Sequence, residues 1–432
     1  MKTKTAALFF LAAMAGISAF TRTKAPPSDL RDAVAEDFNT AIPAFENGDG
    51  NLPVPKPVTT EEKAAKPAAA APAGEWTIII FMNYKNDLGS FGADMLADLT
   101  KIGATADVNV LVETAMFSRG INSDARIYYA EKGNLRLLEA LGPRNMGDWK
   151  ELVKFVRWAK QNYPAKHYML DIMSHGNGWW ADTPVKDTDE SGFSGKNISK
   201  GISPDEETGN NISTPQLGKA LALTGKIDVF APNSCLMQMA EVIYEIKDSV
   251  GFMAGSEETL SLYDIQYDRI LQPLTLNPRM DAGTFGMELV KAHETAATYS
   301  LVDVSAAGEL GPRLDAFAKA VMSANIKSIA RASRKAAHSY GVQEHKDLCH
   351  FVKLVTTAAS DGNVKKTGAE LMDFIKNKLV VSSPGNDGYG IAVYLPDGPR
   401  FYNKTDYSAL KLSKDTRWDE FIQWQLDSSP KK

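Results

Sequence analysis

The sequence predicts an α/β fold in which a mainly parallel sheet lies between two layers of helices. Short apolar runs alternate along the chain with segments of helical periodicity, the pattern of strands joined by crossover helices. Several runs are apolar throughout, so their strands are expected to be buried on both faces. The 432 residues, 44% of them hydrophobic, can build a large core.

The elements follow in order from residue 76, where the folded sequence is expected to start. The predicted strands are 77–82 (TIIIFM), 108–113 (VNVLVE), 126–130 (RIYYA), 168–173 (YMLDIM), 227–231 (IDVFA), 251–255, 299–304 and 388–395. The predicted helices are 90–102, 148–161, 236–246, 314–325, 348–359 and 418–426. Residues 180–216 are polar and longer than an ordinary connection, which indicates a functional or flexible loop.

The N-terminal region is typical of an exported protein. Residues 1–24 predict a signal peptide, because Lys2 and Lys4 precede an apolar run that is short for a membrane span. An uncleaved membrane anchor is the alternative. Residues 25–75 hold eight of the 21 prolines and predict a disordered linker or pro-segment. We expect a secreted or periplasmic protein with no stable membrane insertion after signal removal.

The folded sequence is expected to comprise a catalytic domain, 76–298, and a C-terminal α/β part, 299–432, packed on it. The formal charge of −5 and the absence of a dense Lys/Arg stretch argue against nucleic-acid binding. Two cysteines, Cys235 and Cys349, cannot form a disulfide scaffold, so they either pair or leave a working thiol. We interpret Cys349 as a core residue of helix 348–359.

Reactive side chains follow two of the predicted strands. His175 lies just after strand 168–173 and Cys235 just after strand 227–231, and the carboxyl ends of parallel strands can be neighbours. A cysteine thiolate is a nucleophile, and a histidine can protonate the leaving group. The helix predicted to begin directly after Cys235 would favour the thiolate through its dipole. Gly176 could admit a substrate backbone and donate its N–H to an oxyanion.

The motifs around these residues resemble the clostripain family of clan CD cysteine peptidases, in order and spacing. The matching segments are Trp76 to Leu88 (WTIIIFMNYKNDL), Asn162 to Ala165 (NYPA), Ser174 to Trp179 (SHGNGW), Cys235-Leu236-Met237 with Glu241 and Tyr244, Gly255 to Thr259 (GSEET), Tyr267-Asp268, Tyr407-Ser408, and Trp418 to Phe421 (WDEF). The resemblance therefore covers nearly all of residues 76–426.

This resemblance implies a caspase-like α/β/α sandwich and a cysteine endopeptidase that acts on peptides or proteins. It assigns His175 and Cys235 as the catalytic dyad, with the N–H groups of Gly176 and Cys235 binding the oxyanion. Family members typically cleave after Arg or Lys, often mature by self-cleavage in the loop after the histidine strand, and can respond to calcium. No cofactor is required by this interpretation, although calcium could bind acidic residues of loop 180–216. A solvated loop is the favoured interpretation of those acids.

One departure concerns the substrate pocket. Where the family usually has aspartate two residues before the nucleophile, this chain has Asn233, which cannot neutralise a basic side chain. Asp264 is the candidate for a second, compensating acid. Two alternatives therefore stay open: a peptidase that prefers uncharged residues before the cut, and a binding protein that kept the fold without catalysis.

Two further groups of residues are interpreted as structural, with no catalytic or metal-binding role. Asp171, inside an apolar strand, is expected to be a buried carboxylate with hydrogen-bond partners, too far along the strand to contact His175. His345, Cys349 and His350 lack a fourth ligand at suitable spacing, so no metal site is predicted there.

Overall fold

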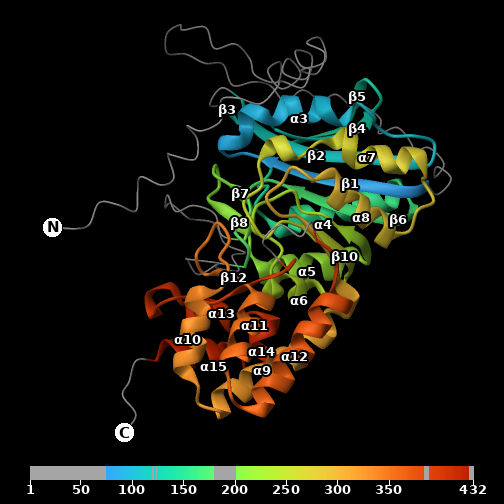
Figure 1. Ribbon diagram of the computed structural model, residues 1–432. Coiled ribbons are helices and arrows are strands. Elements are labelled where there is room, and N and C mark those ends of the chain that lie inside the picture. The colour runs from blue at the N-terminus through green and yellow to red at the C-terminus, as the bar shows by residue number, and fades with distance from the viewer. Residues whose placement is uncertain (1–73, 119–120, 123, 180–200, 384–388, 428–432) are drawn as a thin grey trace, which may run out of the picture.

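One large sheet between two layers of helices forms the centre of the molecule (Figure 1). The computed structural model describes residues 74–118, 121–122, 124–179, 201–383 and 389–427. The predicted signal peptide, 1–24, and the linker up to residue 73 lie outside the described residues. The predicted linker is slightly too long, because residues 74 and 75 already belong to the first strand. The predicted α/β sandwich is confirmed.

Within the described residues, ten strands form the central sheet, in the order β13-β11-β10-β9-β6-β1-β2-β4-β5, with β3 paired to β2 outside this path. The central strands β10, β9, β6, β1 and β2 are parallel neighbours, and the antiparallel pairs lie toward the edges. The bounds are β1 Gly74–Tyr84, β2 Val108–Ser118, β3 Ile121–Asn122, β4 Ala125–Glu131, β5 Asn134–Gly142, β6 Ala165–Met173, β9 Ile227–Phe230, β10 Val250–Gly255, β11 Ser300–Asp303 and β13 Val380–Ser382.

The central strands are buried on both faces, as their continuous apolar runs predict. In β1, Ile79 and Phe81 pack into the core on one face, and Ile78, Ile80 and Met82 pack on the other. Successive side chains of a strand point to opposite faces, so each face of β1 receives every second residue. A strand in this position therefore needs apolar residues at every central position.

Helices cover the two faces of the sheet unequally. One layer consists of α3 Gly92–Leu99, α7 Tyr267–Leu276 and α8 Ala282–Ala292. The other contains α4 Trp149–Asn162, α5 Thr214–Thr224 and α6 Ala240–Ile246, followed by the C-terminal helices α9 Leu310–Ser323, α10 Lys327–Ala336, α11 Leu348–Ala358, α12 Gly362–Phe374, α13 Lys404–Tyr407, α14 Lys411–Asp415 and α15 Trp418–Leu426. In Figure 1 these C-terminal helices gather below α5 and α6.

The chain beyond residue 299 contributes to the sheet as well as to the helical layer. β11 and β13 extend the central sheet, and β12 His345–Asp347 pairs with β14 Ala392–Tyr394 in a separate small sheet. The division proposed at residue 298 stays a prediction, but the sheet itself crosses that point. No helix among the described residues is long and apolar enough to span a membrane.

Three expected elements outside the segment that follows Cys235 differ from the structure. The strand expected at 388–395 is limited to β14, because only its three residues pair with β12. The helix expected at 90–102 divides into a 3-10 turn, η1 Asp87–Phe91, and α3, and the chain then turns at Gly103, whose φ is +66°. Residues 201–216 are not an open loop: they form the hairpin β7 Ile202–Asp205 and β8 Asn210–Ile212 and the start of α5, whereas 180–200 lie outside the described residues.

Candidate active site

The segments that carry His175 and Cys235 meet at one edge of the central sheet. They follow the neighbouring parallel strands β6 and β9. Past the end of β9, Ser234 Oγ donates to Ile172 O near the end of β6 at 2.9 Å, which ties the segment of Cys235 to the strand that precedes His175. A Cβ on Gly176 would lie 2.6 Å from Cys235 O, so this approach requires glycine. The structure therefore brings together the two segments that the sequence predicted to be neighbours.

The chain turns directly after Cys235 and does not enter a helix there. Leu236 has φ 64°, a left-handed conformation that is uncommon for a residue with a side chain, and its N–H donates to Glu258 O at 3.0 Å. α6 begins only at Ala240, after this turn is complete. The predicted helix start beside Cys235 is wrong. The helix dipole acts over the first turn of a helix, so α6 is too far along the chain to activate the thiol as expected.

The Cys235 sulfur lies against the backbone of Leu260. Leu260 N–H donates to Sγ at 3.2 Å, and Sγ is 3.6 Å from Leu260 O. Burial raises the pKa of the Cys235 thiol, the Leu260 N–H opposes this rise, and the Glu258 carboxylate adds to it. We therefore expect the resting thiol to be protonated at neutral pH.

The second cysteine is a core residue, as the sequence predicted. Cys349 is completely buried in α11, and both it and Cys235 are free thiols. Burial raises the pKa of Cys349 to about 12, which leaves its thiol unreactive at neutral pH. The interpretation of a working thiol therefore applies to Cys235.

The His175 ring contacts an aspartate that the sequence did not single out. His175 Nε2 lies 2.5 Å from Asp87 Oδ1, and Asp87 is the first residue of η1, shortly after β1 ends. The Asp87 side chain is 75% exposed, so water weakens the pair. The contact still fixes the orientation of the imidazole ring. Its only signal in the sequence was the Asn-Asp-Leu turn within the resemblance.

Asn86 attaches the turn that carries Asp87 to the residue before His175. Asn86 Nδ2 donates to Ser174 Oγ at 3.2 Å and to Pro204 O at 3.1 Å. Asn86 Oδ1 accepts from Leu88 N–H at 3.0 Å and caps η1. Because Asn86 is buried, these bonds hold Asp87 near the imidazole even though Asp87 itself is exposed.

We expect Asp87→Asn to lower kcat by on the order of tenfold while KM changes little, because the imidazole loses its orienting carboxylate. Peptide hydrolysis by the purified protein measures both constants. Asp87→Glu should recover part of kcat. Asp107→Asn removes the same charge at the opposite end of the sheet, where Asp107 precedes β2, and should leave kcat unchanged. Equal effects of Asp87→Asn and Asp107→Asn would contradict a positioning role.

Asn233 is held in a buried polar network beneath Cys235. Its backbone N–H donates to Asp171 Oδ1 at 3.0 Å, and its Nδ2 donates to Asp171 Oδ2 at 2.6 Å. Tyr267 OH donates to the same carboxylate at 2.7 Å, and Asn233 Oδ1 lies 3.0 Å from His293 Nε2. Burial raises the pKa of Asp171 to about 6 and lowers that of His293 to about 4. Asp171 is thus the buried, hydrogen-bonded carboxylate that the sequence predicted.

Comparison with known proteins matches this arrangement to one family. Residues 80–424, most of the chain, match the sequence model of the clostripain family. The chain belongs to the clostripain family. It is therefore a cysteine protease, a hydrolase, by family, and the family resemblance noted in the sequence is confirmed. Among curated proteins, none matches this sequence.

Solved structures of other C11 proteases share the fold. A secreted C11 cysteine protease from Bacteroides thetaiotaomicron, called iotapain, has a TM-score of 0.60 and 14% identity, covering 80% of this chain and 99% of its own. An inactive zymogen C11 protease from Parabacteroides distasonis has a TM-score of 0.57 and 16% identity, covering 80% of this chain and 98% of its own. At such identities the similarity establishes the shared fold.

The second residue predicted to bind substrate in this clostripain-family protein, Asp264, lies in the neighbourhood of His293. Asp264 Oδ1 accepts from Thr295 Oγ1 at 2.8 Å, and Asp264 Oδ2 accepts from Ser261 N–H at 3.3 Å in the turn η2 Leu262–Asp264. The Asp264 carboxylate also raises the pKa of His293, against the effect of burial. His293 thus has Asn233 as a hydrogen-bond partner and Asp264 in its neighbourhood. The substrate-binding roles of Asn233 and Asp264 stay predictions.

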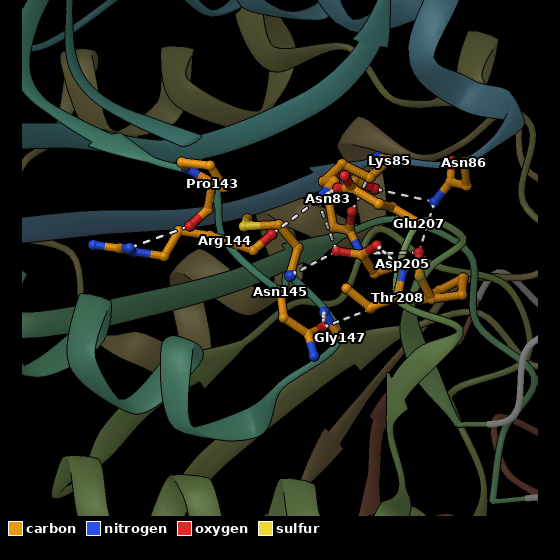
Figure 2. A network of polar contacts seen from close by, with 12 residues as sticks. Asn83, Lys85, Asn86, Pro143, Arg144, Asn145, Gly147, Asp205, Glu207 and Thr208 are labelled. Atoms are coloured by element: carbon orange, nitrogen blue, oxygen red, sulfur yellow. Dashed lines mark hydrogen bonds and ion pairs between the residues drawn. The ribbon is translucent and has the colours of Figure 1, made fainter. Parts of the chain in front are cut away.

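The acids proposed as calcium ligands belong partly to an ion-pair network on β7 (Figure 2). Buried Lys85 pairs with Asp205 Oδ2 at 3.3 Å and with Glu207, and its Nζ donates to Arg144 O at 2.9 Å. Asp205 Oδ2 also accepts from Met146 N–H at 2.9 Å. These carboxylates therefore already have a cation, and among the described residues no group of His, Cys, Asp or Glu is arranged to hold a metal ion. The acids at 187–190 lie outside the described residues.

Proposed function

We propose that this clostripain-family protein is an exported endopeptidase that uses Cys235 as nucleophile and His175 as acid and base. The observation that supports this proposal best is the meeting of the two segments at the carboxyl edge of parallel strands. There, Gly176 packs on the Cys235 backbone and Asp87 orients the imidazole. Such an arrangement serves acyl transfer to a thiol.

The reaction follows from the protonation states. The Cys235 proton passes to His175 as the sulfur attacks the peptide carbonyl, because burial keeps the resting thiol protonated. The C–N bond then breaks, His175 protonates the leaving amine, and a thioester remains on Cys235. Water, deprotonated by His175, hydrolyses the thioester and releases the thiol. The N–H groups of Gly176 and Cys235 are the proposed donors to the oxyanion.

The test is hydrolysis of a fluorogenic peptide library, varied at the residue before the cut, by protein beginning at residue 25. Reducing agent keeps Cys235 as a thiol, and parallel reactions with calcium and with a chelator test the proposed calcium response. Release of fluorophore supports the endopeptidase. If a folded protein hydrolyses no library member under any condition, the binding-protein alternative replaces it. Detection of the protein outside the producing cell, with residues 1–24 removed, tests export.

For specificity, the site favours the alternative of an uncharged residue before the cut over Arg or Lys. The polar atoms of the Asn233 side chain are bound to Asp171 and His293 and face the interior. A guanidinium or ammonium group entering there would meet an amide that is already engaged, and an unpaired cation in a closed pocket is costly. The Asp264 carboxylate is already engaged, because it accepts from Ser261 N–H at the start of η2 and from Thr295 Oγ1.

We expect the wild-type library profile to favour uncharged residues before the cut. Exchanging the two partners in the double variant Asp171→Asn with Asn233→Asp keeps one amide and one carboxylate but moves the charge toward Cys235. That variant should shift kcat/KM toward Arg over Leu by about tenfold or more. The single change Asn233→Asp should not shift kcat/KM toward Arg, because the new carboxylate would lie next to that of Asp171 and the two cannot both stay ionised. A wild-type preference for Arg or Lys would contradict the uncharged pocket.

A further inference from the structure

The Cys235 sulfur is the last member of a short ladder of hydrogen bonds between two segments. Gln238 N–H donates to Ser256 O at 3.1 Å, and Leu236 N–H donates to Glu258 O at 3.0 Å. From the first hydrogen bond to the second, the donor residue moves two positions back along the chain and the acceptor residue moves two positions forward. This is the pattern of antiparallel pairing. The next alternate residue along the second segment is Leu260. The Leu260 N–H donates a hydrogen bond to the Cys235 sulfur at 3.2 Å.

The segment that ends at Leu260 is anchored independently of Cys235. Glu258 N–H donates to both Ser256 Oγ and Thr298 Oγ1 at 3.1 Å, and these two hydroxyl groups bond each other at 3.0 Å. Ser256 is completely buried and Thr298 nearly so. The position of Leu260 N–H is therefore set by the fold before any substrate binds, which is the condition for a preorganised donor.

Apart from the backbone of Cys235 itself, which also lowers the pKa of its thiol, the other groups that could act on a thiolate in the resting site are placed unfavourably. α6 begins at Ala240, beyond the turn, so its helix dipole does not reach the sulfur, contrary to the prediction from the sequence. In the resting site, His175 Nε2 contacts Asp87 Oδ1 rather than the sulfur. The neighbouring Glu258 carboxylate opposes a negative charge on the sulfur. The N–H of Leu260 is the donor from the facing segment that contacts Sγ.

We propose that the backbone N–H of Leu260 is the thiolate-stabilising donor of the active site and holds Cys235 Sγ in its attacking position. The proposal rests on the proposed role of Cys235 as nucleophile. A hydrogen bond to an ionised sulfur is stronger than one to a neutral thiol, so the donor favours the charged form. When the sulfur becomes a thioester, the charge disappears and the hydrogen bond weakens. Leu260 acts through its backbone, so its side chain can vary.

The test compares Leu260→Pro, which removes the N–H, with Leu260→Ala, which keeps it. The readout is the Cys235 pKa from the pH dependence of iodoacetamide alkylation, followed by mass spectrometry on the full chain from residue 25. Leu260→Ala should titrate as wild type. Leu260→Pro should raise the pKa by about one unit and slow alkylation at neutral pH roughly tenfold. Identical titrations of the two variants would overturn the proposal.

A second measurement avoids any backbone change. In protein labelled with 15N-leucine, the Leu260 amide signal is identified as the one lost in Leu260→Ala. It should shift with pH at the Cys235 pKa and stop shifting after the thiol is alkylated. A Leu260 amide signal whose chemical shift does not change as the Cys235 thiol titrates would overturn the proposal. Both readouts are independent of peptide hydrolysis, so a protein that cleaves no peptide would refute the peptidase while leaving this result intact.

Discussion

Cys235→Ala is expected to reduce peptide hydrolysis by more than about 10⁴-fold, because no other side chain can form the thioester. His175→Ala should have a comparable effect, since the thiol proton then has no acceptor at the site. The double variant should be no worse than either single variant, because two residues that act as a unit give strongly non-additive losses. Initial rates on the best library substrate measure all three.

The matched control is Cys349→Ala, which removes the other thiol from the core of α11. It should keep the activity of the folded enzyme, although a smaller side chain in a packed core lowers stability. Hydrolysis that survives in Cys235→Ala would contradict the assignment of the nucleophile. Hydrolysis that disappears in folded Cys349→Ala would show that the two thiols act together.

Asp171→Ala is expected to lower the free energy of unfolding by about 3 kcal/mol or more, because three donors lose their acceptor inside the core. These donors are the backbone N–H and Nδ2 of Asn233 and the hydroxyl of Tyr267. Urea unfolding followed by circular dichroism measures the change. The variant should also lose activity below its unfolding transition, because Asn233 is two residues from Cys235.

Two control variants distinguish the loss of the buried hydrogen-bond network from the loss of a single carboxylate charge. Tyr267→Phe removes a single donor and should cost about 1 kcal/mol. Asp248→Ala removes a carboxylate whose side chain is 68% exposed and should change stability by less than about 1 kcal/mol, since surface ion pairs contribute little. If Asp171→Ala destabilises no more than Asp248→Ala, the network is not a structural anchor of the site.

The central strands are the elements that the sequence predicted most directly. Residues 77–82 and 168–173 are apolar at nearly every position, and only a strand covered on both faces suits such a run. Cys235 follows the strand 227–231, and the carboxyl ends of parallel strands can be neighbours at one edge of a sheet, so the sequence predicted that His175 and Cys235 lie near each other. Asp171 within the second run also had to find partners, since an isolated charge cannot stay buried.

Some elements left too weak a local pattern for prediction. The helix α7 buries Tyr267, Ile270, Leu271 and Leu274 and α8 buries Phe285 and Leu289, all at helical spacing, but Pro273 in α7 and Gly283 and Gly286 in α8 are poor helix formers that weaken the local signal. The start of α6 was placed too early because the apolar residues after Cys235 fit a helical period. The conformation of Leu236 overrode that preference, and its hydrogen bond to Glu258 is a long-range contact.

By itself the sequence determined the α/β sandwich, the family, the neighbouring positions of His175 and Cys235, and the burial of Asp171 and Cys349. These conclusions depend on apolar periodicity and on motifs, which are local properties of the chain. The tertiary structure alone decided that Asp87 orients His175, that His293 engages Asn233, and that Leu260 N–H contacts the sulfur. Each of those contacts joins residues at least 25 positions apart, and only packing sets such distances.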